Sequence, residues 1–117
     1  MSSLVAVLSS GKGTWTQINA LIKTHNWNNI YLITNDFGKE NFKSEKLAQF
    51  ILVDMRKNTK LLRDDIIKEL KGKLDGDVGF NMSSGIGEEH MAALSALLNL
   101  GVGIRIITHN GQGMEEL

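Results

Sequence analysis

Apolar residues occur along the chain in five short runs, and each run ends at polar residues or glycine. Runs of this length are typical of strands that are buried on both faces of a parallel sheet. They predict strands at residues 4–8, 30–33, 50–53, 77–82 and 102–108. Gly79 interrupts the fourth run and weakens its strand pattern.

Between these runs, apolar residues recur every three or four positions, which places them on one face of an α-helix. The predicted helices start after Thr14 and cover residues 42–49, 59–71 and 88–100. Thr14 and Gln17 have the spacing of a capping box, and Asn58 or Thr59 can cap the third helix. Gly101 is placed to end the last helix.

Strands and helices therefore alternate along the whole chain, with short connections. Right-handed crossovers turn this order into a parallel sheet that is covered by helices on both faces. We expect one domain, residues 1–117, with a three-layer α/β/α Rossmann-like fold and a five-stranded sheet in the order 3-2-1-4-5. The first and fourth strands are then neighbours, and sheets of this kind bind ligands in the crevice between the carboxyl ends of such strands.

The glycines mark this crevice. The chain has 12 glycines and no proline, and eight of the glycines form four Gly-x-Gly pairs. Two pairs belong to one repeated pattern, Ser-Ser-Gly-x-Gly, at residues 9–13 after the first strand and residues 83–87 after the fourth. Of the other two pairs, Gly101 and Gly103 suit a helix end and turn, and Gly111 and Gly113 are expected to loosen the tail.

Both serine-glycine loops have the chemistry of a nucleotide site. Glycine lets the backbone approach a ligand, serine offers a hydroxyl, and the following helix presents free N–H groups, which together suit phosphate or ribose. The candidate ligand-binding residues of the first loop are Ser9, Ser10, Gly11, Lys12, Gly13 and Thr14. Tight packing of the two turns is the alternative explanation for their glycines and serines. Glu88 and Glu89 would repel a phosphate, so the second loop suits base or ribose, or binds nothing.

The chain lacks two common nucleotide-binding motifs. The first loop is not a P-loop, because Gly13 rather than serine or threonine follows Lys12, and Thr16 breaks a dinucleotide fingerprint. Asp36 ends the second strand, where a ribose-binding acid lies in dinucleotide-binding folds. His109, at the carboxyl end of the fifth strand, is the histidine placed for an acid–base or base-contact role, and a solvated strand end is the alternative.

Composition and charge narrow the function classes. The 117 residues contain 13 basic and 13 acidic side chains, which argues against binding duplex nucleic acid, and they contain no cysteine for disulfides or thiolate metal sites. We expect no metal site, no cofactor and no membrane span, and the absence of a signal pattern predicts a cytoplasmic protein. Residues 56–73 carry seven basic side chains against three acids, which predicts a solvated helix face or an anionic partner.

Residues 77–85, followed by an alanine- and leucine-rich helix, resemble the CARF family, the CRISPR-associated Rossmann fold. The family's later ligand motif is matched by Asn81, Ser83, Ser84 and Gly85. Ser9, Ser10 and Gly11 take the place of its earlier ligand loop. The motifs cover about a dozen residues, while the element order covers nearly the whole chain. One departure is that Gly87, Glu88 and Glu89 stand where the family often has lysine or arginine.

The resemblance implies a homodimer that binds a cyclic oligoadenylate, a second messenger of type III CRISPR defence, across its two-fold axis. We therefore expect a nucleotide sensor rather than an enzyme. The first alternative is a metal-independent ring nuclease, in which a ribose 2′-hydroxyl attacks the phosphodiester and Lys12 and Ser10 are catalytic, with Lys12 substituting for the missing cation. The second is a Rossmann-like interaction domain without a ligand. As a sensor or a ring nuclease, the chain is expected to be a stand-alone domain or a piece of a larger protein.

Overall fold

Main-chain hydrogen bonds between strands define the architecture of the computed structural model, which describes residues 1–117. The strands are β1 (Ser3–Val7), β2 (Asn29–Thr34), β3 (Gln49–Leu52), β4 (Asp77–Asn81), β5 (Gly103–His109) and β6 (Met114–Glu116). The helices are the short 3₁₀-helix η1 (Lys12–Thr14), α1 (Trp15–Thr24), α2 (Asp36–Asn41), α3 (Thr59–Leu70) and α4 (Gly87–Leu100). The strands form one six-stranded sheet in the order β3-β2-β1-β4-β5-β6.

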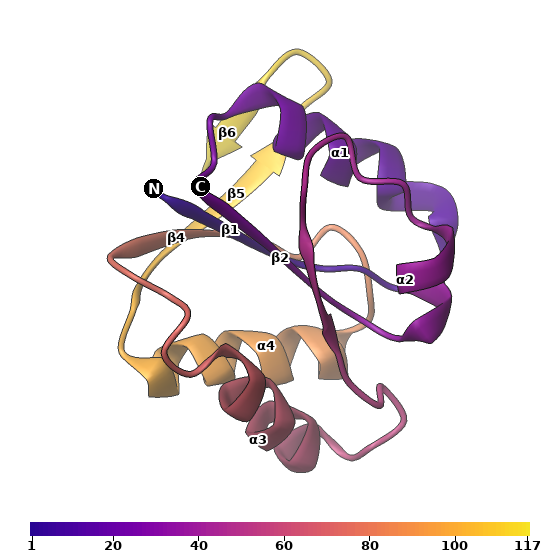
Figure 1. The fold of residues 1–117 in the computed structure, drawn as a ribbon, viewed down its shortest axis with the longest axis vertical. Coiled ribbons are helices and arrows are strands. Elements are labelled where there is room, and N and C mark those ends of the chain that lie inside the picture. The colour runs from indigo at the N-terminus through magenta and orange to yellow at the C-terminus, as the bar shows by residue number, and fades with distance from the viewer.

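The sheet confirms the predicted Rossmann-like topology. β1 pairs in parallel with both β2 and β4, β3 pairs in parallel with β2, and β5 pairs in parallel with β4. Figure 1 shows α3 and α4 on one face of the sheet and α1 on the other. The side chains of β1 alternate between two cores: Val5 and Val7 pack with α3 and α4, and Leu4 and Ala6 pack with α1.

A sixth strand was not predicted. β6 is antiparallel to β5, with His109 opposite Met114. The Gly-x-Gly pair that we expected to loosen the tail instead forms the hairpin turn: the Asn110 N–H donates to the Gly113 carbonyl over 3.1 Å, and Gly111 has a φ of 95°. A strand of three residues is too short to give a readable alternation of apolar and polar positions.

The second helix lies six residues earlier than predicted. α2 spans Asp36–Asn41 because the side chain of Asn35 caps it, with the Gly38 N–H donating to the Asn35 Oδ1 over 3.0 Å. Phe42, expected inside the helix, ends it and is buried beside α1. The apolar spacing of this segment therefore reflects burial of an irregular connection rather than a helix.

The start of α1 also differs from the prediction. Thr14 makes no capping hydrogen bond and belongs to η1, which runs directly into α1 with the Trp15 N–H donating to the Lys12 carbonyl. The predicted Thr14–Gln17 capping box is thus wrong, because Thr14 has a φ of −106° and a ψ of 1° rather than the extended backbone of an N-cap residue. The caps of the later helices are confirmed: the Leu61 N–H donates to the Asn58 Oδ1, and Gly101 ends α4 with a φ of 74°.

Gly79 is buried at the centre of the sheet for a packing reason. A Cβ built on it would lie 2.8 Å from the Trp27 ring and 2.9 Å from the Ile107 Cδ1. The indole of Trp27 is itself held by a hydrogen bond from its Nε1 to the Leu21 carbonyl, 3.0 Å long. The glycine therefore makes room for the side chains that cover this part of β4.

We predict that Gly79→Ala lowers the free energy of unfolding by about 1–3 kcal/mol, because an added methyl overpacks a core that has no room for it. Urea denaturation followed by tryptophan fluorescence measures the change. Gly113→Ala is the matched control, since a Cβ there meets nothing within 4 Å, and it should be near neutral. Equal stability of the two variants would contradict this packing role.

Candidate functional site

The two serine-glycine loops meet where β1 and β4 lie side by side. Ala6 of β1 is in register with Asn81 of β4, so both strands deliver their loops to the same edge of the sheet. The main-chain N–H of Ser9 donates a hydrogen bond to the Ser84 Oγ over 2.8 Å. Ser84 is only 2% exposed, so this bond joins the loops beneath the surface.

The second loop is held rigidly by buried polar contacts. Asn81, 1% exposed, donates from Nδ2 to the Ile107 carbonyl over 2.9 Å and to the Ser83 Oγ over 3.0 Å. Its Oδ1 accepts the Ser83 N–H over 3.2 Å. Both amide hydrogens of Asn81 are therefore engaged within the protein. Asn81 and Ser83, both predicted ligand-binding residues, fix the path of the loop between β4 and α4.

Beyond Ser84 the chain turns sharply beside His90. Gly85 has a φ of 102°, in the left-handed region that favours glycine, and a Cβ there would lie 3.0 Å from the Val7 Cγ1. The His90 Nε2 lies 2.8 Å from the Ser84 carbonyl and can donate to it. His90 thus supports the loop, a role that sequence analysis did not assign to it.

The glutamates that follow the second loop occupy the helix start. The Glu89 Oε1 accepts the main-chain N–H of Ile86 over 3.1 Å, so a carboxylate already serves a donor that a bound anion would use. Glu88 lies next to it in the first turn of α4 and is exposed. This end of the crevice is therefore electrostatically unfavourable for phosphate, as the sequence indicated.

The first loop presents the free polar groups. Its base is fixed, because the Trp15 Nε1 donates to the Ser9 carbonyl over 2.9 Å. Ser10, Gly11, Lys12 and Gly13 are exposed beyond that point. The Lys12 Nζ lies 5.8 Å from the ring centroid of Trp15, within the range of a cation–π contact, and forms no ion pair with a carboxylate. Its charge is thus available to a ligand.

His109 lies in a separate place. It lines a cleft of about 410 Å³ between α1 and the β5–β6 turn, together with Thr16, Gln17 and Gly111. The His109 Nδ1 accepts the Gly111 N–H over 3.1 Å. The structure therefore pairs His109 with the β5–β6 hairpin, across a cleft from the start of α1.

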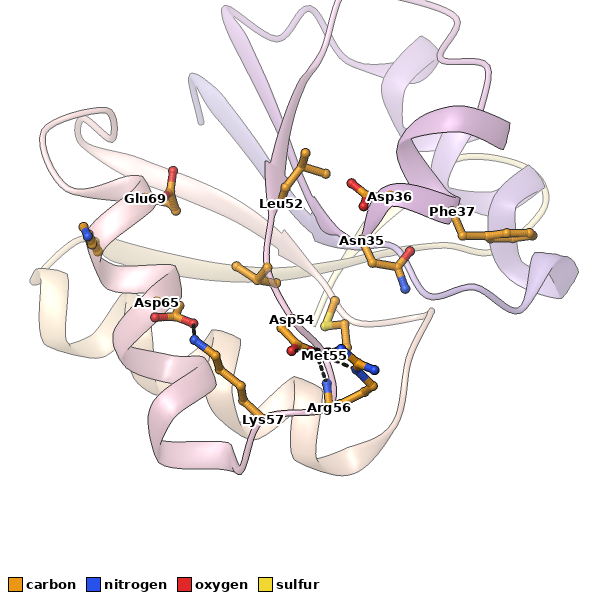
Figure 2. A pocket seen from close by; sticks show the side chains of 12 residues that line it. Asn35, Asp36, Phe37, Leu52, Asp54, Met55, Arg56, Lys57, Asp65 and Glu69 are labelled. Carbon is orange, nitrogen blue, oxygen red and sulfur yellow. Dashed lines mark hydrogen bonds and ion pairs between the residues drawn. The ribbon is translucent and has the colours of Figure 1, made fainter.

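A larger cleft, of about 700 Å³, opens at the carboxyl ends of β2 and β3, between α2 and α3 (Figure 2). Its lining consists of Asn35, Asp36, Phe37, Leu52, Val53, Asp54, Met55, Arg56, Lys57, Asp65, Lys68 and Glu69. The sequence pattern had marked Asp36 and Asp54 as strand ends and residues 56–73 as a basic run, without predicting that they line one cleft. The pairing of β2 with β3 is what places the two aspartates at the same edge of the sheet.

Ion pairs order the charged groups of this cleft. The Arg56 Nε donates to one oxygen of Asp54 over 3.1 Å and Nη2 to the other over 3.4 Å. These bonds hold the pKa of Asp54 below its ordinary value and raise the pKa of Arg56. The Lys57 Nζ lies 2.7 Å from an Asp65 oxygen, which raises the pKa of Lys57.

Comparisons with known proteins identify the fold alone. No family model and no curated protein matches the sequence. The structure is similar to the crystal structure of protein VC1899 from Vibrio cholerae, with a TM-score of 0.64 and 15% sequence identity. The match covers 98% of this chain and 33% of that chain, so this chain spans about a third of its length.

No three histidine, aspartate or glutamate side chains are grouped so that they could hold a metal ion. None of the helices combines the length and the apolar composition that crossing a membrane requires.

We predict that Ser84→Ala lowers the free energy of unfolding by about 1–3 kcal/mol, because the partly buried Ser9 N–H loses its acceptor. Chemical denaturation measures the change. Ser10→Ala is the matched control: its hydroxyl is exposed and makes no hydrogen bond, so its loss should be near neutral. A Ser84→Ala protein as stable as the control would show that the loops are not tied together here.

We predict that the carboxyl group of Asp54 titrates below its ordinary pKa, and that Arg56→Gln returns the value toward normal. A lowered pKa in the folded state means that this pair stabilises the protein above the unfolded-state pKa. The contribution is lost as pH falls through the folded-state pKa. Carbon-detected NMR titration of the side chain tests this, and an Asp54 pKa that is unchanged by Arg56→Gln would contradict the pairing.

Proposed function

We propose that this chain is a nucleotide-sensing domain, similar to CARF domains, that binds a cyclic oligoadenylate at the carboxyl edge of its sheet. The observation that carries the proposal is the hydrogen bond from the Ser9 N–H to the Ser84 Oγ. It unites the two repeated loops at the reversal point of the strand order, where open α/β sheets bind ligands.

The first loop supplies the groups for the phosphates. Lys12 contributes a positive charge without a carboxylate partner, and Ser10 contributes an unpaired hydroxyl. Gly11 and Gly13 are exposed, and nothing lies within 4 Å of a Cβ built on either, so a ligand can approach their backbone closely. The second loop, with Glu89 at the helix start, acts mainly by shaping the first and by facing uncharged parts of the ligand.

We propose that α4 forms the interface with a second copy of the chain. Ile86, Met91 and Leu98 are 59%, 57% and 64% exposed. Met91 and Leu98 are seven residues apart, so they project from one side of α4, and Ile86 is the N-cap residue that precedes the helix. Large apolar side chains grouped in this way favour a protein interface. A dimer formed there would bring two copies of the loops near a two-fold axis.

A ring nuclease is the second candidate function for the same site. In that reaction a ribose 2′-oxygen of the ligand forms a bond to the neighbouring phosphorus. The 2′-hydroxyl loses its proton, the bond from phosphorus to the 5′-oxygen breaks, and the 5′-oxygen takes up a proton. The product is linear, with a 2′,3′-cyclic phosphate at one end and a 5′-hydroxyl at the other. The observation in its favour is the unpaired charge of Lys12, which could stabilise the developing negative charge, with Ser10 beside it.

We predict that Lys12→Ala weakens binding of cyclic tetra-adenylate by about ten- to a hundredfold, because one charge-assisted contact is worth roughly 1.5–3 kcal/mol. Ser84→Ala should also weaken it, by loosening the loop that carries Lys12. Isothermal titration calorimetry measures both. Lys60→Ala is the control, since Lys60 is an exposed lysine of α3 without an ion pair. No heat with any cyclic oligoadenylate would refute the sensor.

The two candidate functions are separated by the fate of the ligand. Cyclic tetra-adenylate incubated with the protein and analysed by mass spectrometry should remain cyclic if the domain only senses it. Accumulation of linear product that Lys12→Ala abolishes would instead favour the nuclease.

A further inference from the structure

Phe37 connects the cleft between α2 and α3 with the first loop. Phe37, the second residue of α2, borders the cleft, and its ring lies on the opposite side of α2 from Asp36 (Figure 2). That ring is 5.6 Å from the Lys12 Nζ and 6.1 Å from the ring of Trp15, measured to the centroids. A ligand with its phosphate on Lys12 can therefore extend over α2 into the cleft, whose volume of about 700 Å³ suits a small molecule.

The α2 wall of this cleft offers hydrogen-bond acceptors without partners. Asp36 is exposed, forms no ion pair, and its carboxylate points across the cleft toward Leu52 (Figure 2). An ionised carboxylate only accepts hydrogen bonds, so its natural partners are hydroxyl or amine groups of a ligand. A ribose ring presents two adjacent hydroxyls that fit the two oxygens.

Arg56 supplies a flat surface that is already ordered. Its side chain is 91% exposed, yet the guanidinium is oriented by its contacts with Asp54. Its main-chain N–H also donates to the Asp54 Oδ1, over 3.0 Å, which fixes the turn that carries it. Guanidinium planes stack on nucleobases, and one that is held in place loses little freedom on binding.

The charge balance of the cleft sets the orientation of the ligand. Four acids (Asp36, Asp54, Asp65 and Glu69) face three bases (Arg56, Lys57 and Lys68), so a phosphate gains little by entering. Val53 and Leu52, which is 39% exposed, add apolar surface suited to a base. The uncharged end of a nucleotide belongs in this cleft, and the phosphate belongs outside it at Lys12.

We propose that this cleft is a nucleoside subsite. One ribose of the bound nucleotide gives hydrogen bonds from its hydroxyls to Asp36, and the attached base stacks on Arg56. This inference deepens the proposed function and rests on it, since it needs a nucleotide whose phosphate reaches Lys12.

The test follows backbone amide signals of the ¹⁵N-labelled full chain by NMR during titration with AMP, inorganic phosphate and cyclic tetra-adenylate. AMP and cyclic tetra-adenylate should shift the signals of residues 35–37 and 52–57 as well as those of residues 9–14. Inorganic phosphate should shift only the latter group. The difference between AMP and phosphate locates the nucleoside, because the two probes share only the phosphate.

Variants then separate the contacts. Asp36→Asn should weaken AMP binding about tenfold and leave binding of 2′,3′-dideoxyadenosine monophosphate unchanged, because that probe lacks both hydroxyls. Arg56→Gln should weaken both probes to a similar extent. Arg63→Gln is the matched control and should change neither, since Arg63 pairs with Asp64 outside the cleft.

The outcomes distinguish the inference from the proposed function. Shifts confined to residues 9–14 with AMP and cyclic tetra-adenylate, together with unaltered binding by Asp36→Asn and Arg56→Gln, would overturn the subsite and leave nucleotide sensing at the loops intact. An absence of shifts anywhere with all three probes at millimolar concentration would overturn both.

Discussion

The parallel pairing of β1 with β4, sealed by the hydrogen bond from the Ser9 N–H to the buried Ser84 hydroxyl, is the constraint on which the carboxyl edge depends. It brings together two loops that are 75 residues apart in the chain. Ser84 is held in turn by the contact of its carbonyl with His90. The hydrogen bond to Ser84 therefore fixes the start of the first loop. Only its tip, with Ser10 and Lys12, is left free to meet a ligand.

Charge is distributed along this edge so that one position favours an anion. The chain has no net charge, the start of α4 is occupied by Glu89, and the α2–α3 cleft nearly balances its own ions. Lys12 is the cation beside the paired loops that no carboxylate neutralises. The nucleotide proposed above, with one charged and one uncharged end, would therefore bind in one direction, with its phosphate at Lys12 and its nucleoside toward α2 and α3.

The strands and later helices were predictable because their signals are local. Buried parallel strands need continuous apolar runs, and Asn58 and Gly101 act on their own helix ends. The errors came from segments whose apolar residues are buried by tertiary contacts. Phe42 is buried in an irregular connection, and β6 exists only because β5 offers it an open edge. Neither fact leaves a periodic pattern in the sequence.

The sequence by itself determined the order of elements, the repeat of the serine-glycine pattern and therefore the strand ends at which a ligand site would form. The tertiary structure alone decided which polar atoms remain free there. Asn81, Ser83 and Ser84 form hydrogen bonds that hold the loops, and Lys12 has no carboxylate partner. His109 accepts a hydrogen bond from the turn of the β5–β6 hairpin. The reason is physical: a polar side chain that becomes buried must find a partner, and the partners come from distant parts of the chain that only folding brings together.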